Sequence, residues 1–169
     1  MVHSIELVFD RDTEAAVRRI WEELAGAGIP SQAPASRPHV TMAVADRISS
    51  EVDELLSPVA ATLPLSCAIG APVLFGRASV VFARLVGPTA ELLALHSEVH
   101  RLCAPYLDPA PMPNSLPGHW TGHVTLARRV GGAQLGRALR IAGRPAQING
   151  SFAGLRRWDG NKRAEQPIT

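Results

Sequence analysis

Two spacings of apolar residues divide this chain into expected strands and helices. Alternation of apolar and polar residues is typical of strands with one buried face, and apolar residues every three or four positions are typical of amphipathic helices. Strands are predicted at residues 3–9, 39–44, 63–75 (one strand, or two divided at 70–72), 79–86, 119–127 and 147–152. Helices are predicted at residues 13–25, from about residue 50, at about 89–104 and around 135–139.

The order of these expected elements repeats. Residues 3–71 give strand, helix, strand, helix, strand, and residues 79–152 give the same order. Such a repeat is typical of two similar lobes. We therefore expect an α+β fold of two lobes related by a pseudo-two-fold axis, whose antiparallel sheets are backed by helices and form a central cleft. The chain would be a single two-lobed domain, with lobe one at about residues 1–76 and lobe two at about 77–169.

A four-residue motif occurs once in each half, as His39-Val40-Thr41-Met42 and as His123-Val124-Thr125-Leu126. Histidine and threonine are two residues apart in an expected strand, so both side chains point to the same face. A single copy would be explained more readily by a core or edge histidine. Two copies in equivalent positions, each after a proline-rich loop, predict that two imidazoles and two hydroxyls meet around a phosphate-sized space. Neither motif contains a carboxylate or a thiolate, so we expect acid–base chemistry on a phosphodiester.

Charge and cysteine content narrow the class of protein. The 169 residues include 17 Lys+Arg and 15 Asp+Glu, a net charge of +2, which favours a small anionic ligand or an RNA end over a long nucleic acid. Cys67 and Cys103 are far apart and outside any CxxC motif, so we expect small buried residues of a reducing compartment, without a disulfide or a zinc site. Neither a signal peptide nor a membrane span is recognisable, which predicts a soluble cytoplasmic protein.

The motifs resemble those of the two-histidine (2H) phosphoesterase superfamily and, within it, the LigT-like or 2′-5′ RNA ligase-like proteins. Pro38-His39-Val40-Thr41 and His123-Val124-Thr125-Leu126-Ala127-Arg128 carry the resemblance, and the bilobal order of elements extends it over nearly the whole chain. The resemblance implies a metal-independent cyclic phosphodiesterase or 2′-5′ ligase that acts on RNA termini or small cyclic nucleotides. It also implies that both motif histidines are catalytic and that both motif threonines contact the phosphate.

Two arginines are candidates for phosphate binding. Arg128 matches the arginine that often closes the second motif of this family, whereas Val44 stands at the corresponding place after the first motif. Phosphate neutralisation by the motifs would therefore be one-sided. Strand alternation places Arg37 on the same face as His39 and Thr41, but it places Arg128 on the opposite face unless the strand bends just before it. We expect Arg37 to be the better placed of the two, although a loop arginine without this role remains an alternative.

The expected reaction is hydrolysis of a 2′,3′-cyclic phosphate at an RNA 3′ terminus or in a small cyclic nucleotide. One of His39 and His123 would take the proton of the attacking water and the other would protonate the leaving ribose oxygen, while Thr41 and Thr125 hold the non-bridging oxygens. The same groups could catalyse 2′-5′ ligation in reverse, and a non-catalytic module that binds a phosphate or an RNA end is a further alternative. We expect no metal ion, no cofactor, no membrane and a monomer.

Residues beside the second motif could contact a nucleoside. His119 shares the alternation of His123 and would extend the same face of the expected strand. Trp120 and Tyr106 could stack on a base, as aromatic residues do in proteins that bind single-stranded RNA. The alternation also fits Trp120 as a core residue, so both interpretations stay open.

Two further groups of residues have a plain explanation beside a functional one. His96 and His100 are four residues apart on an expected helix and could bind a metal, but Glu98 lies on the other side, and we favour a solvent-exposed pair. Near the C-terminus, Asp159-Gly160 is typical of a hairpin turn. Its basic residues could attract RNA or only form a solvated sheet edge, and Trp158 would cover that edge. The basic residues are Arg156, Arg157, Lys162 and Arg163.

Overall fold

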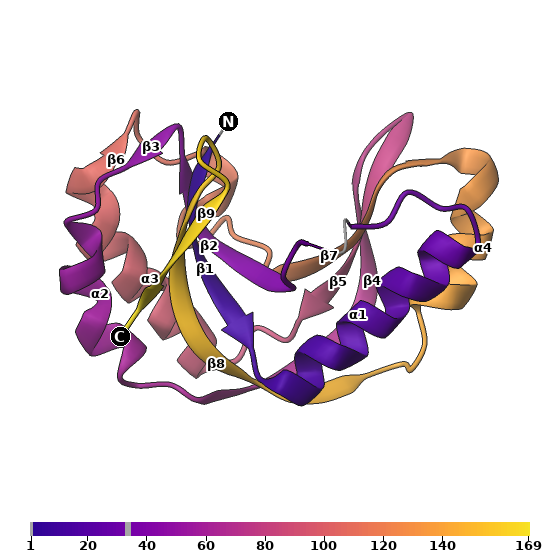
Figure 1. Ribbon diagram of the computed structural model, residues 1–169, viewed down its shortest axis with the longest axis horizontal. Coiled ribbons are helices and arrows are strands. Elements are labelled where there is room, and N and C mark those ends of the chain that lie inside the picture. Colours follow the sequence, from indigo (N-terminus) through magenta and orange to yellow (C-terminus); the bar gives the residue numbers. More distant parts are fainter. Residues whose placement is uncertain (1, 33–34) are drawn as a thin grey trace.

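The computed structural model describes residues 2–32 and 35–169, which form helices and antiparallel strands in two lobes (Figure 1). The strands are β1 (His3–Phe9), β2 (His39–Ala45), β3 (Arg47–Ile48), β4 (Leu65–Gly76), β5 (Ser79–Val86), β6 (Leu107–Asp108), β7 (His123–Gly131), β8 (Ile148–Asp159) and β9 (Ala164–Ile168). The helices are α1 (Arg11–Gly26), α2 (Val52–Ala60), α3 (Ala90–Cys103) and α4 (Gly132–Ala142), with short 3₁₀ helices η1 (Ala104–Tyr106) and η2 (Pro113–Ser115). The expected α+β class is confirmed. Residues 33 and 34 of the first proline-rich loop lie outside the described residues.

One long strand, β8, connects the two lobes. The main sheet has the order β2-β1-β8-β4-β5-β7, β9 also pairs with β8, and all these pairings are antiparallel. Residues 152–159 of β8 pair with β1, and residues 148–152 pair with β4. Figure 1 shows β8 curving along the base of the molecule from one lobe to the other. The strands β2 and β7, which carry the two motifs, therefore lie at opposite ends of the strand order.

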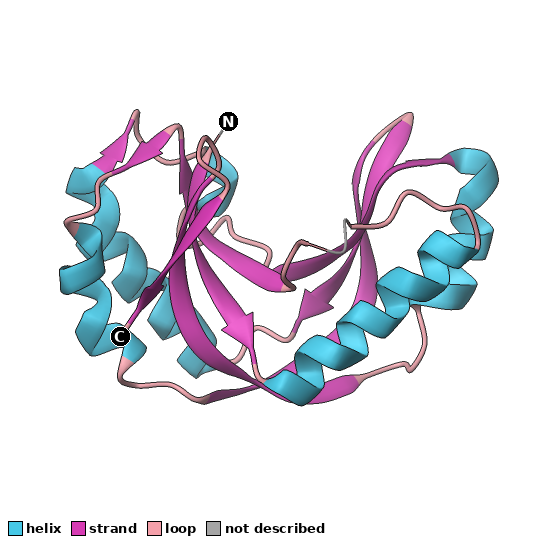
Figure 2. Cartoon of the chain, viewed as in Figure 1, coloured by secondary structure: helices cyan, strands magenta, loops and turns pink. Residues whose placement is uncertain are grey.

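The lobes do not correspond to the N-terminal and C-terminal halves of the chain. Helices α2 and α3 pack together and α3 contacts β2, whereas α1 and α4 pack together and both contact β7. Figures 1 and 2 show these two helix pairs on the outer sides of the lobes. The expected boundary near residue 76 falls between β4 and β5, which are paired neighbours. The two halves thus exchange helices, because the apolar stripe of α1 packs against strands that come from the second half.

Both motif strands contain a β-bulge at the same place. The register with the neighbouring strand shifts just after each motif threonine, so that Met42 in β2 and Leu126 in β7 are each one additional residue. Each bulge places two consecutive residues in the core, and the alternation is then reset. As a result, Val44 and Arg128 return to the face that carries the motif side chains, and both line the same cleft.

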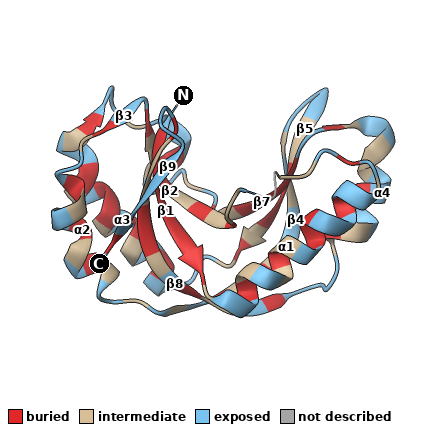
Figure 3. Ribbon diagram, viewed as in Figure 1, coloured by how far each residue is buried: buried red, intermediate tan, exposed pale blue. Residues whose placement is uncertain are grey.

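The core runs along the central strands and the inward faces of the helices (Figure 3). The second motif strand begins at His123, so the predicted start at residue 119 is wrong. Cys67 and Cys103 are free and buried, and burial raises the pKa of each thiol to about 12, which keeps both neutral. Within the described ranges, helices long and apolar enough to cross a membrane are absent.

Candidate active site

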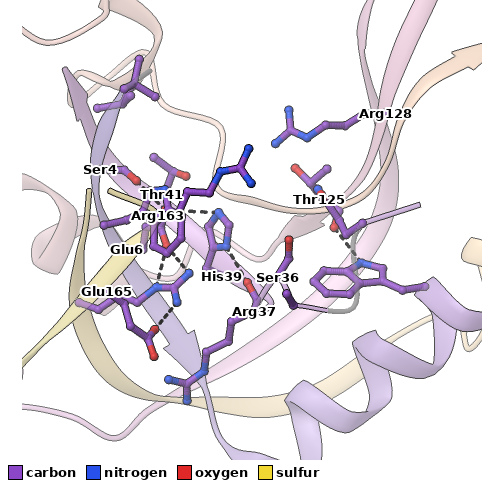
Figure 4. Close-up of a pocket in the computed structure, with 17 residues that line it drawn as sticks. Ser4, Glu6, Ser36, Arg37, His39, Thr41, Thr125, Arg128, Arg163 and Glu165 are labelled. Carbon is purple, nitrogen blue, oxygen red and sulfur yellow. Dashed lines mark hydrogen bonds and ion pairs between the residues drawn. The ribbon is translucent and has the colours of Figure 1, made fainter. Parts of the chain in front are cut away.

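A cleft of about 510 Å³ lies between the lobes and is lined by residues of both motif strands. His39 and Thr41 reach it from β2, and Thr125 and Arg128 reach it from β7. Figure 4 shows these side chains around a common space. The structure therefore brings together the two motifs, which are 84 positions apart in the sequence.

Both motif histidines are held by the same hydrogen bond. Nδ1 of His39 lies 2.8 Å from the carbonyl oxygen of Arg37, and Nδ1 of His123 lies 2.7 Å from that of Thr121. A carbonyl oxygen can only accept, so each Nδ1 carries the proton and donates it. This arrangement leaves Nε2 of each ring as the atom that can accept or deliver a proton.

The environment of His123 favours the neutral imidazole. Its half-buried ring packs against Phe75, with ring centroids 4.6 Å apart. Burial is the main cause that lowers the pKa of His123, and the positive charges of His39 and Arg128 lower it further against the opposing effect of the Thr121 carbonyl. His123 is therefore close enough to His39 for their charges to interact, although its ring does not itself line the cleft described above.

Glu6 on β1 is a buried carboxylate at the first motif, and the spacing of the motifs does not predict it. Its Oε1 lies 3.5 Å from Nε2 of His39 and accepts a hydrogen bond of 2.5 Å from the hydroxyl of Ser4. Its Oε2 binds the buried guanidinium of Arg156 at 2.6 and 2.8 Å, and Arg156 also pairs with Glu165. His39 therefore has a carboxylate neighbour from outside the two motifs.

A signal for Glu6 was present in the sequence. It is the one acidic residue within the apolar strand at residues 3–9, and all seven residues of that strand are buried. A carboxylate in such a strand needs a charged or hydrogen-bonding partner. The partner, Arg156, is 150 positions away, so only the fold could reveal the pair.

The two predicted phosphate-binding arginines differ in their partners. Nε of Arg37 donates to Glu14 of α1 at 2.9 Å, and Figure 4 shows the Arg37 guanidinium turned away from the space between the motifs. The bulge in β7 brings Arg128 to the cleft side, where Figure 4 shows its guanidinium extending into that space. Among the residues that the structure describes, Arg128 forms no ion pair with a carboxylate. The geometry thus favours Arg128 over Arg37 for contact with an anion.

Two tryptophans fix the bulged motif strands. The indole N–H of Trp21 in α1 donates to the carbonyl oxygen of Thr125 at 3.1 Å, and that of Trp120 donates to the carbonyl oxygen of Thr41 at 2.9 Å. Each motif is therefore held by a tryptophan from the other half of the chain. The ring of Trp120 is stacked on His96, with centroids 4.0 Å apart and planes 9° apart, so this side chain packs inside the protein.

The other predicted nucleoside contacts lie elsewhere. His119 is exposed in the turn before β7, and Tyr106 lies in η1, where it packs against the core. Neither these residues nor Trp120 line the cleft. In their place, the cleft wall contains Trp158 and Arg163 from the β8–β9 hairpin, with the guanidinium of Arg156 5.5 Å from the Trp158 ring centroid.

The predicted solvent-exposed position of His96 and His100 is wrong, because their side chains are 1% and 5% exposed. Their Nε2 atoms lie 3.0 and 2.9 Å from the carbonyl oxygen of Met42, the bulged residue of the first motif strand. Burial, followed by the charge of His100, lowers the pKa of His96 to about 4, and burial also lowers the pKa of His100. Both histidines therefore hold the first motif strand by hydrogen bonds at its bulge.

We find no cluster of three or more His, Cys, Asp or Glu side chains suited to a metal ion within residues 2–32 and 35–169. The polar groups of the side chains that line the cleft are imidazole, hydroxyl, amide, indole and guanidinium groups, together with carboxylates that Arg156 already binds.

Comparisons with known proteins identify the family of the chain and show the same fold in solved structures. Residues 9–161 match the model of a family described as the 2′-5′ RNA ligase superfamily, whereas no curated protein sequence matches the chain. The solved structure of E. coli LigT complexed with 3′-AMP is 13% identical, with a TM-score of 0.59 over 99% of this chain and 94% of that chain. TT0787 of Thermus thermophilus is 14% identical (TM-score 0.62, coverage 100% and 96%), and the MHV ns2 PDE domain is 16% identical (0.55, 99% and 99%).

At these identities the three structures show a shared fold. The family model carries the assignment further, since it spans nearly the whole chain and includes both His-x-Thr motifs. The chain therefore belongs to the 2′-5′ RNA ligase superfamily.

Proposed function

We propose that this protein hydrolyses a 2′,3′-cyclic phosphate, at an RNA 3′ end or in a small cyclic nucleotide, without a metal ion. The observation that carries the proposal is the matched pair of hydrogen bonds from Nδ1 of His39 and His123 to backbone carbonyls. These bonds leave two Nε2 atoms for proton transfer, one from each motif strand. A base and an acid on opposite sides of a phosphorus atom are what an in-line displacement requires.

The surroundings of the two rings suggest which histidine is the general base and which is the general acid. His123, whose pKa is lowered chiefly by burial, is the base that accepts a proton from the attacking water at Nε2. The water oxygen then bonds to phosphorus, and the bond from phosphorus to one ribose oxygen breaks. His39, with Nε2 beside Glu6, donates a proton to that ribose oxygen. The product is a nucleoside or RNA end with a phosphate monoester on the other ribose oxygen.

Neutral and cationic hydrogen-bond donors stabilise the phosphate. The hydroxyls of Thr41 and Thr125 donate hydrogen bonds to the non-bridging oxygens, and Arg128 offsets the negative charge that grows there in the transition state. A cleft that binds a phosphate in this way agrees with the 3′-AMP bound in the structure of E. coli LigT, since 3′-AMP is a nucleotide with a phosphate on the ribose.

Ligation is the second candidate, and the description of the superfamily favours it. A ribose hydroxyl in place of water would give a 2′-5′ phosphodiester, with His39 and His123 unchanged in their roles. Hydrolysis is the simpler proposal because it needs one nucleotide substrate in the cleft.

The test is turnover of 2′,3′-cyclic AMP by the purified protein in EDTA, with chromatographic separation of 2′-AMP and 3′-AMP. We expect release of one monophosphate, and we expect His39→Ala to lower kcat by about 10²–10⁴-fold without loss of the folded state. Strong inhibition by EDTA that one divalent ion reverses would contradict the metal-free mechanism. Binding of the nucleotide without turnover would support a binding module instead.

A further inference from the structure

The two motifs supply positive charge to the cleft unequally. After the bulge in β7, Arg128 reaches the cleft, whereas after the matching bulge in β2 the equivalent residue is Val44. Both residues line the cleft, so the first motif offers an apolar side chain where the second offers a guanidinium. A phosphate bound between the strands would therefore have a cation on one side only.

The β8–β9 hairpin brings a cation to the side that lacks one. Arg163, at the end of the turn between β8 and β9, lines the same cleft as Val44 and His39. Figure 4 shows its side chain extending from the hairpin toward the space beside His39, on the opposite side of the cleft from Arg128. The sequence does not predict this position, because Arg163 lies 119 positions after Val44.

The carboxylates of the cleft do not neutralise Arg163. Glu6 and Glu165, which line the cleft, both bind the guanidinium of Arg156. Arg37 is paired with Glu14. In the part of the chain that the structure describes, Arg128 and Arg163 are the cleft-lining arginines without an ion pair to a carboxylate. Two unmatched cations that face one space from opposite walls are arranged for an anion.

The hairpin holds Arg163 in a defined place. Oδ1 of Asp159 accepts hydrogen bonds from the backbone N–H groups of Asn161 and Lys162 at 2.9 and 3.0 Å, and it lies 3.3 Å from Nε2 of His3. Arg163 itself has a φ of 53°, a left-handed conformation that glycine adopts more readily than a residue with a long side chain. The chain keeps an arginine where glycine would be less strained, which indicates a use for the side chain.

We propose that Arg163 is a substrate-binding residue that contacts the phosphate group of a nucleotide from the side opposite Arg128. It supplies the positive charge that the first motif lacks at Val44. This inference rests on the proposed function for the identity of the ligand as a nucleotide phosphate. Its physical basis is a cleft-wall arginine that, among the described residues, has no ion pair with a carboxylate, and this does not depend on which reaction follows binding.

Arg163→Gly tests the proposal, because it removes the guanidinium and also relieves the left-handed backbone, so the variant should fold at least as well as the wild type. Calorimetry measures the Kd of 3′-AMP, and a separate assay measures kcat/KM for 2′,3′-cyclic AMP. Loss of one charge-assisted contact should weaken 3′-AMP binding and lower kcat/KM, each by on the order of 10- to 100-fold. Arg163→Lys, which keeps the charge, should retain most of both.

Lys162→Ala is the matched control, because it removes a neighbouring cation from the same turn, and the Lys162 side chain is 81% exposed and outside the cleft lining. It should change both measurements less than twofold. Arg163→Gly within twofold of the wild type, or a loss as large in Arg163→Lys, would overturn the inference, as would a wild type that binds no 3′-AMP. If the wild type binds 3′-AMP through Arg163 but does not turn over any cyclic nucleotide, the inference stands and the proposed hydrolysis fails.

Discussion

The buried histidine pair below the first motif predicts that this fold loses stability in mild acid. His96 is 1% exposed, and burial followed by the charge of His100 lowers its pKa to about 4 in the folded protein. The unfolded chain has a histidine pKa of about 6.5, so below that pH the unfolded state binds a proton at this histidine that the folded state does not bind. The contribution of neutral His96 to the free energy of unfolding is therefore fully present above pH 6.5 and is lost as the pH falls toward 4. The pKa difference corresponds to a loss of about 3 kcal/mol in the free energy of unfolding.

Urea denaturation at pH 7.5 and at pH 4.5 measures this effect directly. His96→Phe keeps an aromatic ring against Trp120 and leaves His100 to donate to Met42, so it removes the titrating group with little loss of packing. The decline in unfolding free energy between the two pH values should be smaller in His96→Phe than in the wild type by about 2–3 kcal/mol. His119→Gln, at an exposed position, should follow the wild type. Equal declines in the wild type and His96→Phe would refute the reasoning.

Three further predictions concern the cleft. Glu6→Gln leaves the buried guanidinium of Arg156 with one partly exposed partner, so the free energy of unfolding in urea should fall by about 3 kcal/mol, and an unchanged value would contradict the buried pair. Thr41→Val and Thr125→Val should each lower kcat/KM by about 2- to 12-fold, since each loses one neutral hydrogen bond to the phosphate. A loss as large as that of a motif histidine would contradict this role. Because the pKa of His123 is lowered, a neutral base persists in weak acid, and the acid limb of the pH profile of kcat/KM should have its midpoint below pH 6.5. A midpoint above pH 6.5 would count against His123 as the base.

Local spacing was sufficient to predict most of the secondary structure, but not how it is shared between the lobes. The apolar stripe of α1 and the hairpin at Asp159 were both predicted, and both are present. β8 is far longer than the predicted strand at residues 147–152, because its second half is stabilised by pairing with β1 and β9 rather than by its own alternation. The exchange of helices between the halves likewise depends on long-range packing that has no local signature.

Some features of the candidate site could likewise be predicted from local spacing, and others could not. The spacing of histidine and threonine was sufficient to predict that the two side chains of each motif share a face, because one regular strand segment fixes that face. Alternation failed for Arg128, since the bulge at Leu126 shifts the register by one residue and reverses the face that follows. Glu6 and Arg163 were missed as cleft residues because they come from β1 and the β8–β9 turn, which only the folded sheet places beside the first motif.

The most direct test of the account is a double-mutant cycle on the two motif histidines, measured as kcat for 2′,3′-cyclic AMP. His39→Ala and His123→Ala should each lose about 10²–10⁴-fold in kcat, and the double variant should lose far less than the product of the two, because the base and the acid act as one unit. Melting temperatures would establish that each variant is folded. Near-normal turnover by either single variant would contradict the two-imidazole mechanism, since the cleft lining of the described residues offers no further imidazole to replace either ring.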